Sequence, residues 1–263
     1  MVTTSDSYRI LTKDLTRTLS RTASDPQVAR ETEYYRANIG NVKSIDDFLK
    51  NDRLYRYALK AFGLDDVSYA KAFIKKVLKE GIDDRNAFAN KLADPRYRDL
   101  AATFNFARNG EATTSTDAVK QTTVDRYVQL TLEQTAGAQN EGVRLALYFA
   151  RKAPELRSTL GILADKALLK VAQTALRIPA ATSAIDIDKQ VEIYAKRVNV
   201  EDFKDPKKLE AFINRFTTLY ELDNGSAANP ASSPSSILVG GRASFGISAS
   251  TLASIQSLKL GGL

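Results

Sequence analysis

Apolar residues recur along the first 222 positions with the spacing of amphipathic helices. Between 66 and 80, for example, Phe73, Ile74, Val77 and Leu78 occupy positions i, i+1, i+4 and i+5. These positions lie on one face of an α-helix, because its turn contains 3.6 residues. No stretch shows the alternation of a half-buried strand. The pattern therefore predicts an all-α, multi-helix bundle of about ten helices.

Capping residues and prolines mark where the helices begin. Asp25-Pro26, Asp94-Pro95 and Asp205-Pro206 each place a capping side chain before a proline, which the first turn of a helix tolerates. Ser44 and Asp47 resemble a capping box that opens a helix running to Phe62. Further helices are predicted over 66–80, 117–135, 141–152, 160–178 and 185–198. We expect the following phenylalanines among the buried residues: Phe62, Phe73, Phe88, Phe104, Phe212 and Phe216.

A helix-sized unit occurs twice in the first half of the chain, at 52–64 and 94–106. The shared positions are Asp52 and Asp94, Tyr55 and Tyr97, Arg56 and Arg98, and Phe62 and Phe104. The shared Tyr-Arg pair lies outside the bare apolar pattern, which favours internal helix duplication. Helical periodicity alone is the alternative interpretation, and it is favoured for a looser third copy at 166–178.

Composition divides the chain into a helical body, residues 1–222, and a low-charge C-terminal tail, residues 223–263. The body has 66 charged side chains and the tail has three. The polar segment 107–116 is a candidate seam, which would divide the body into halves 1–106 and 117–222. The tail opens as a Gly/Ser-rich linker and ends in an apolar segment.

The apolar segment of the tail is a candidate interaction site. We expect it to dock on a hydrophobic surface, either in cis, on another copy, or on a partner protein. The residues that docking would bury are Ile237, Leu238, Val239, Phe245, Ile247, Leu252, Ile255 and Leu258.

The missing residue types limit the chemistry. The chain has no cysteine and no histidine, so disulfides, thiolate metal sites and histidine-based catalysis are excluded. No cofactor, metal site or catalytic residue is predicted. The alternative is a hydrolase or phosphoryl-transfer enzyme that uses paired carboxylates with magnesium, which would show acidic side chains converging in one deep pocket.

The net charge of +7 suggests a polyanion partner, but its distribution argues against nucleic acid. Residues 1–110 carry 20 Lys/Arg and 15 Asp/Glu, and residues 111–222 carry 16 and 15, so the two signs are interleaved. The densest basic patch is Lys71, Lys75, Lys76 and Lys79, which form one helix face. A solvated face is the simpler interpretation, and a polyanion-binding helical module is the second alternative function.

Several motifs resemble one bacterial family. They are Ala23-Ser-Asp-Pro-Gln-Val28, Tyr34-Tyr-Arg-Ala-Asn-Ile-Gly40, Ser44-Ile-Asp-Asp-Phe-Leu49, the segment 53–64, Tyr69-Ala-Lys-Ala-Phe73 and Phe88-Ala-Asn-Lys-Leu92. Together they resemble the domain of unknown function 1217, which is common in alphaproteobacteria, closely over 20–106 and more loosely over 107–222. The resemblance implies an all-helical fold without assigned catalytic residues. It also implies a flagellar link, because members are often encoded beside flagellar genes or labelled as flagellar basal-body rod proteins.

The sequence therefore favours a non-enzymatic interaction or assembly protein associated with the bacterial flagellum, with a protein partner. No apolar run approaches the ~20 residues of a membrane span. The N-terminus lacks the features of a secretory signal, so we expect cytoplasmic synthesis, with flagellar association or signal-peptide-independent export afterwards.

Overall fold

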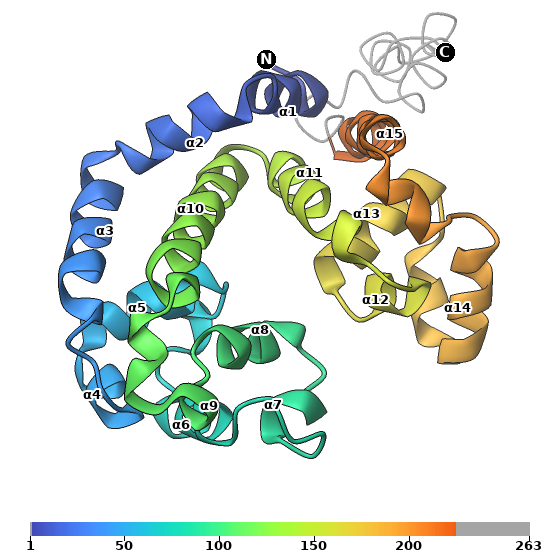
Figure 1. Ribbon diagram of the computed structural model, residues 1–263. Coiled ribbons are helices and arrows are strands. Elements are labelled where there is room, and N and C mark those ends of the chain that lie inside the picture. Colours follow the sequence, from blue (N-terminus) through green and yellow to red (C-terminus); the bar gives the residue numbers. More distant parts are fainter. Residues whose placement is uncertain (1, 225–263) are drawn as a thin grey trace, which may run out of the picture.

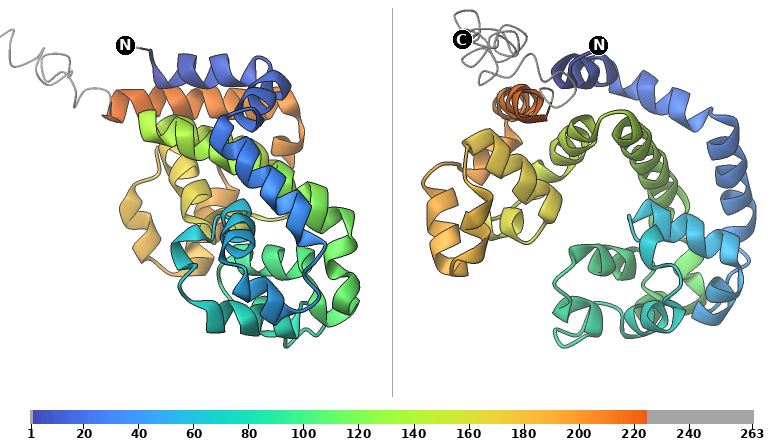
Figure 2. Two further views of the ribbon diagram at one scale, coloured as in Figure 1. Left: turned by 90° about the vertical axis from the view of Figure 1, so that its left-hand side faces the viewer. Right: turned by 180° about the vertical axis from the view of Figure 1, so that it is seen from behind.

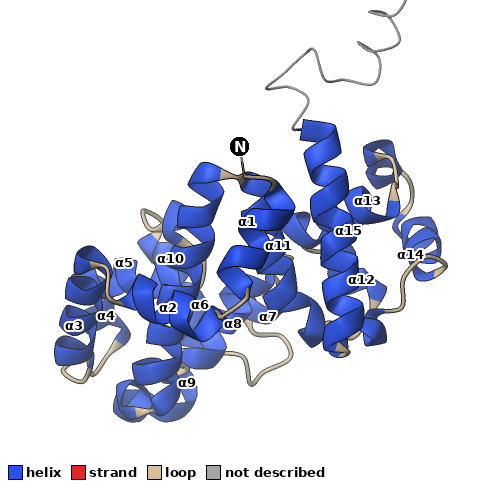
Figure 3. Ribbon diagram, turned by 90° about the horizontal axis from the view of Figure 1, so that it is seen from above, coloured by secondary structure: helices blue, strands red, loops and turns tan. Residues whose placement is uncertain are grey.

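The computed structural model describes residues 2–224 of the chain. Over these residues the chain forms helices and loops and no strand (Figure 3), so the predicted all-α class is confirmed. Within residues 2–224, eleven α-helices have nine residues or more, in agreement with the predicted number of about ten.

The helices form an arch with two lobes (Figure 1). Two long helices, α10 (Thr123–Gln139) and α11 (Glu141–Lys152), meet at Asn140, and one lobe lies at the far end of each. The N-terminal strap, which we define as α1 (Thr4–Thr12) and α2 (Leu15–Ala23), follows the outer edge of the arch. Because α1 packs against α11 and α2 packs against α10, the strap spans the junction of the two long helices.

The first lobe is built by the chain between the strap and α10. Its elements are α3 (Pro26–Ile39), α4 (Ile45–Lys50), α5 (Asp52–Ala61), η1 (Asp65–Val67), α6 (Lys71–Glu80), α7 (Phe88–Lys91), α8 (Pro95–Thr103), α9 (Phe106–Asn109), η2 (Gly110–Ser115) and the π-helical turn η3 (Ala118–Thr122). At its centre Tyr57 stacks between Tyr35 and Tyr127, with ring centroids 4.4 Å and 3.9 Å away. Stacked aromatic rings thus join α3, α5 and α10.

The second lobe is built by α11 and the chain that follows. Its further elements are η4 (Ala153–Glu155), α12 (Thr159–Leu163), α13 (Lys166–Leu176), η5 (Ala180–Ala184), α14 (Ile187–Ala195), η6 (Val200–Lys204) and α15 (Pro206–Asn224). Phe149, Phe203 and Phe212 form a triangle with centroids 5.0–5.2 Å apart. These rings hold α11, η6 and α15 together.

Helix α10 belongs to both lobes. Its first half contributes Val124, Tyr127 and Val128 to the core of the first lobe, and its second half contributes Leu132 and Ala136 to that of the second. The buried side chains therefore change from one cluster to the other within α10. This division differs in position from the candidate seam at 107–116, which stays a prediction about domains.

The α10–α11 junction depends on a capping residue and on close packing. Asn140 accepts hydrogen bonds from the backbone N–H groups of Gly142 and Val143, so it begins α11 directly after α10 ends. A Cβ atom on Gly142 would lie 2.4 Å from the Tyr220 ring and 2.8 Å from the Thr4 side chain. Only glycine lets α1, α11 and α15 approach this closely.

The two chain ends described meet beside this junction. Glu221 of α15 accepts hydrogen bonds from the backbone N–H of Thr4 (2.9 Å) and from its hydroxyl (2.5 Å). The side-chain amide of Asn140 donates to the same hydroxyl at 2.9 Å. The start of α1 and the end of α15 consequently lie side by side (Figure 2).

Some predicted helix boundaries differ from those observed. The helix predicted from Ser44 to Phe62 is interrupted at Asn51, whose side chain accepts from the backbone N–H of Leu54 and caps α5. The helix predicted over 160–178 is interrupted in the same way at Asp165. Asn and Asp favour such breaks, because their short side chains satisfy the free N–H groups of a helix start. The strap helices were not predicted at all, since their sequence is rich in Ser and Thr.

Three of the six phenylalanines predicted to be buried are buried: Phe62, Phe104 and Phe216. The other three, Phe73, Phe88 and Phe212, are half-buried at the edges of the clusters. The two units of the repeat form α5 and α8, and each helix has a phenylalanine directly after its last residue. These two rings, Phe62 and Phe104, contact each other edge to face at 6.2 Å.

Candidate functional site

A cavity of about 790 Å³ lies between the two lobes. We call it the interlobe cleft. It is lined by the start of α8, by one side of α10, by α11 and by the start of α13. Its acidic side chains are Asp65, Asp94, Asp99, Asp125, Glu133 and Asp165. Its basic side chains are Arg96, Arg126, Arg144, Arg151, Lys152 and Lys166. The formal charges of the lining cancel, so the cleft has no overall sign with which to attract a charged ligand.

A buried ion pair joins α10 to α11 at the top of the cleft. The Glu133 side chain is 1% exposed, and its two carboxylate oxygens accept from Arg151 Nε at 2.7 Å and Nη2 at 2.9 Å. Gln129 donates to the same carboxylate at 3.2 Å. Burial would lower the pKa of Arg151, but the hydrogen bonds and charge of Glu133 raise it above its usual value, so Arg151 keeps its positive charge.

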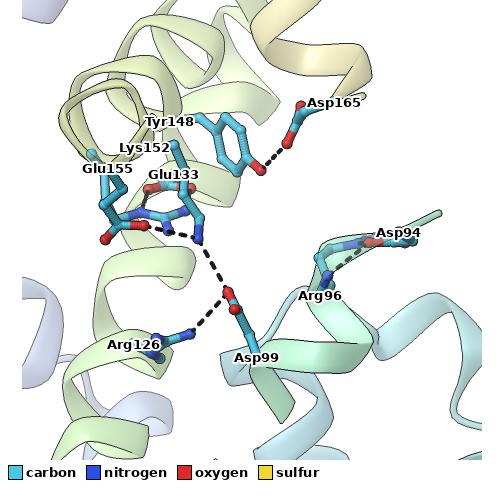
Figure 4. Close-up of polar contacts among 10 residues, drawn as sticks. Asp94, Arg96, Asp99, Arg126, Glu133, Tyr148, Lys152, Glu155 and Asp165 are labelled. Atoms are coloured by element: carbon cyan, nitrogen blue, oxygen red, sulfur yellow. Dashed lines mark hydrogen bonds and ion pairs between the residues drawn. The ribbon is translucent and has the colours of Figure 1, made fainter. Parts of the chain in front are cut away.

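A second ion pair crosses the cleft from one lobe to the other (Figure 4). Asp99 of α8 forms an ion pair with Lys152 of α11, with an Nζ–Oδ2 distance of 3.2 Å. It forms a second one with Arg126 of α10, with an Nη1–Oδ2 distance of 3.7 Å. Lys152 is also 3.4 Å from Glu155. Asp99 therefore links the first lobe to the first helix of the second lobe.

Two helix N-termini lie at the cleft, and each is already capped by its own aspartate. Asp94 accepts from the backbone N–H of Arg96 at 2.9 Å, and Asp165 accepts from those of Ala167 and Leu168 at 2.8 and 3.0 Å. Asp165 also accepts from the Tyr148 hydroxyl at 2.5 Å. The N–H groups that could bind an anion are therefore occupied by carboxylates of the chain itself.

The pKa shifts of Asp94 and Tyr148 keep these two side chains of the cleft in their ordinary protonation states. Burial would raise the pKa of Asp94, but its hydrogen bonds with Arg96 lower it below its usual range. Burial and the charge of Asp165 raise the pKa of the Tyr148 hydroxyl, so this group donates as a neutral phenol. Neither shift produces a group that exchanges protons near neutral pH.

The four lysines of the basic face that the sequence singled out do not line the cleft. Of the basic face on α6, Lys71 pairs with Asp52 and donates to the backbone oxygen of Leu49 at 3.0 Å. Lys75 pairs with Asp46 at 2.5 Å. Lys76 lies 4.2 Å from the centroid of the Phe88 ring, and Lys79 is exposed. Acidic side chains thus neutralise two of the four lysines, and the proposed polyanion site stays a prediction.

The apolar segment of the tail, from Ile237 to Leu258, lies outside the described residues. Within residues 2–224, no group of three or more acidic side chains could hold a metal ion. In the same part of the chain, no helix combines the length and apolar character that crossing a membrane requires.

Sequence reasoning missed the interlobe cleft and its polar residues. Glu133 carried no signal, because a single acid within a long amphipathic helix ordinarily faces solvent. Asp99 and Lys152 are 53 positions apart, so their contact cannot be inferred from spacing. Asp94 was predicted as a helix start, whereas Asp165 lay inside the helix predicted over 160–178, and nothing in the sequence indicates that the two face one cavity.

Comparison with known proteins identifies the family of this chain. The family model described as "Protein of unknown function (DUF1217)" matches residues 61–209. The chain belongs to this family. The resemblance stated from the motifs is thereby confirmed, although the matched range begins after the motifs that lie between Ala23 and Lys60.

A crystal structure of a protein from Agrobacterium tumefaciens is similar to this chain over most of its length. The two sequences are 52% identical, and the superposition has a TM-score of 0.77 and covers 83% of this chain and 93% of the other. This similarity supports the two-lobed helical fold. No curated protein sequence matches the chain.

Proposed function

We propose that this protein is a non-enzymatic component of an assembly, acting through contacts with other proteins, and that the assembly is the bacterial flagellum. The pairing of charges in the interlobe cleft supports the first half of the proposal. Each of its six acidic side chains accepts a hydrogen bond or an ion pair from another side chain of the described residues. Four of these carboxylates connect different helical elements: Asp65, Asp99, Glu133 and Asp165.

The enzymatic alternative needs an arrangement that differs from this one. A two-carboxylate mechanism requires one carboxyl group with a raised pKa opposite a second that stays ionised. The pKa of Asp94 is lowered and not raised, and the carboxylate of Glu133 accepts hydrogen bonds from Arg151 and Gln129. A magnesium site requires carboxylates with free oxygens pointing to one place. The polar side chains of the cleft therefore fit a structural network better than a two-carboxylate catalytic site or a magnesium site.

The flagellar half of the proposal rests on the family. The chain is a member, and the resemblance implies that members are often encoded beside flagellar genes. A helical arch with exposed apolar side chains suits a protein that binds others: Val2, Ile10 and Tyr69 are 62%, 67% and 83% exposed.

A deletion strain of the native bacterium tests the flagellar role. We expect it to swim poorly in soft agar and to carry fewer or shorter flagella, and we expect the full chain to restore both. The protein should also be found by immunoblot in purified flagellar basal bodies. Normal swimming together with absence from that fraction would overturn the flagellar proposal.

The same strain separates assembly from catalysis. Complementation with Asp99→Asn or Asp94→Asn, which preserve side-chain shape, should restore swimming, because neither carboxylate performs chemistry in this proposal. A chain lacking residues 226–263 tests the interaction site predicted in the tail, and it should fail to restore swimming. If purified protein hydrolysed a phosphoester or glycoside and Asp99→Asn abolished that turnover, the non-enzymatic half would be wrong.

A further inference from the structure

The N-terminal strap carries four cationic side chains at four-residue intervals: Arg9, Lys13, Arg17 and Arg21. We call them the cationic stripe. All four are exposed, and within residues 2–224 none of their side chains forms a hydrogen bond or an ion pair. The arginines of the interlobe cleft differ, because Arg96 and Arg151 each pair with a carboxylate.

The aspartates of the strap do not neutralise the stripe. Asp6 accepts from the Thr3 hydroxyl at 2.8 Å at the start of α1, and Asp14 accepts from the backbone N–H of Arg17 at 2.9 Å at the start of α2. Both carboxylates are thus engaged in helix caps. Ile10 adds an exposed apolar side chain beside Arg9. The strap therefore presents exposed cationic side chains together with the exposed apolar side chain of Ile10.

An acidic, aromatic projection lies on the first lobe, where η1 leads into α6. It consists of Asp65, Asp66 and Tyr69, and we call it the acidic knob. Residues 61–70 contain no Lys or Arg. Among the large apolar side chains of the described residues, Tyr69 is the most exposed.

The cations nearest to the knob have carboxylate partners of their own. Lys71 follows the knob in the chain and pairs with Asp52. Arg96 interacts electrostatically with Asp66, but it forms its hydrogen bonds with Asp94, at 2.7 Å for Nη2 and Oδ2. Asp65 accepts a hydrogen bond from the side-chain amide of Gln134 at 3.5 Å, but this donor is neutral. Within residues 2–224 the knob therefore forms no ion pair and keeps negative charge to offer to a partner.

We propose that the acidic knob of one copy of this chain docks on the cationic stripe of a second copy. The proposal rests on the assembly role proposed above and names the chain itself as one partner. Asp65 and Asp66 supply the charges that the stripe lacks, and the Tyr69 ring offers a face to an arginine guanidinium. Tyr and Arg are also the residues that most often carry binding energy at protein interfaces.

The knob and the stripe of the same chain face different directions. Leu19 of α2 and Asp65 both line the interlobe cleft. Arg17 and Arg21 each lie two residues from Leu19, about 200° around the helix, so they point away from the cleft. When the knob of one copy binds the stripe of another, the pair still has one free stripe and one free knob. Further copies can therefore add to it, unless the rotation between copies closes the assembly into a ring.

Charge reversal in the full chain tests this contact. Sedimentation velocity would follow self-association over a concentration series at about 0.05 M and about 0.5 M ionic strength. The variants are Arg17→Glu with Arg21→Glu in the stripe, Asp65→Lys with Asp66→Lys in the knob, and Tyr69→Ala. Lys170→Glu with Lys189→Glu is the control, because it reverses two exposed cations of the second lobe that lie outside both the cleft and the strap. Circular dichroism and thermal unfolding would check that each variant folds.

We expect the wild type to self-associate at low ionic strength and to dissociate at high ionic strength. Each double reversal and Tyr69→Ala should weaken association at least about tenfold, and the control should leave it unchanged. An equimolar mixture of the two double-reversal variants should associate again, because each reversed stripe then meets a reversed knob and each native stripe meets a native knob.

A wild type that stays monomeric throughout the series would overturn the proposal. So would association that survives both reversals, or a mixture that fails to associate while each variant is folded. These outcomes are independent of swimming and of the basal-body fraction. Self-association could therefore fail while the flagellar role stands, and the reverse is also true.

Discussion

Cationic side chains line the interlobe cleft and the outer side of the N-terminal strap, but they have different surroundings in the two places. In the cleft, Arg151 and Lys152 meet Glu133 and Asp99, which come from other helices. On the strap, the cationic stripe has no acidic partner within residues 2–224, because Asp6 and Asp14 are occupied in helix caps. The comparison indicates that the charges of the cleft hold this molecule together, whereas those of the strap are available to another one.

The aromatic residues show the same contrast. Tyr35, Tyr57 and Tyr127 are buried and stack on one another inside the first lobe. Tyr69 belongs to the same lobe, yet its ring faces solvent. A buried tyrosine stabilises the fold, and an exposed one beside two aspartates offers a surface for binding.

The largest effect should come from breaking the buried pair of the cleft. Glu133→Ala leaves Arg151 without its partner in a largely buried place and should lower the free energy of unfolding by about 3–5 kcal/mol. Chemical denaturation would measure this loss. Exposed Glu111→Ala is the control and should change stability by less than about 0.5 kcal/mol. The double variant Glu133→Met with Arg151→Met should regain most of the loss, since it leaves no unpaired charge. Equal losses for the single and double variants would mean that packing, and not charge, is responsible.

A smaller effect is expected at the pair that crosses the cleft. Asp99→Asn should cost about 0.5–1 kcal/mol, because the pair is partly exposed to solvent. It should also broaden the distribution of distances between the lobes. The chain contains no cysteine, so spin labels on cysteines introduced at Lys91 and Lys170 can report that distance without background. Arg108→Met, which breaks a pair with Asp83 inside the first lobe, should leave the distribution unchanged. Identical distributions for all three proteins would contradict the role of Asp99 as a link between lobes.

A still finer test uses pH at the start of α8. The folded-state pKa of Asp94 lies below its ordinary value of 3.8, so the ionised group stabilises the fold above that pH and loses its contribution as pH falls through the folded value. Asp94→Asn keeps a capping side chain but removes the charge. It should be less stable than the wild type at pH 7 and should approach the wild type at about pH 3. A difference in unfolding free energy that is the same at both pH values would assign the effect to geometry alone.

The smallest effect is expected on the strap. Arg17→Ala with Arg21→Ala should change the free energy of unfolding by less than about 0.5 kcal/mol, because neither side chain has a partner within the described residues. Thermal unfolding of the dilute protein would measure it. A loss larger than about 1 kcal/mol would show that the stripe stabilises its own chain, and the contrast with the cleft would then disappear.

The sequence was sufficient for the fold class and for many helix starts. Asp25, Asp94 and Asp205 stand before prolines and cap the helices that were predicted from them. This was possible because a cap involves only residues two or three positions apart. The same local logic misjudged 44–62, where Asn51 ends one helix and begins the next.

The candidate site could not be predicted in the same way. The sequence pointed to the lysines of α6, which do not line the interlobe cleft, and to a tail that lies outside the described residues. The cleft exists because α10 and α11 diverge at Asn140 and carry their lobes apart. The angle between two helices is set by packing, here around Gly142, and no local pattern encodes it.

The sequence by itself thus determined that residues 2–224 are helical, where many of the helices begin, and that the chemistry of histidine and cysteine is absent. Only the tertiary structure decided which charges are paired. Glu133 meets Arg151 across 18 positions and Asp99 meets Lys152 across 53, whereas the regularly spaced cations of the strap meet no acid within residues 2–224. The physical reason is range: helix periodicity and capping act within a few residues, whereas ion pairing depends on which helices the folded chain brings together.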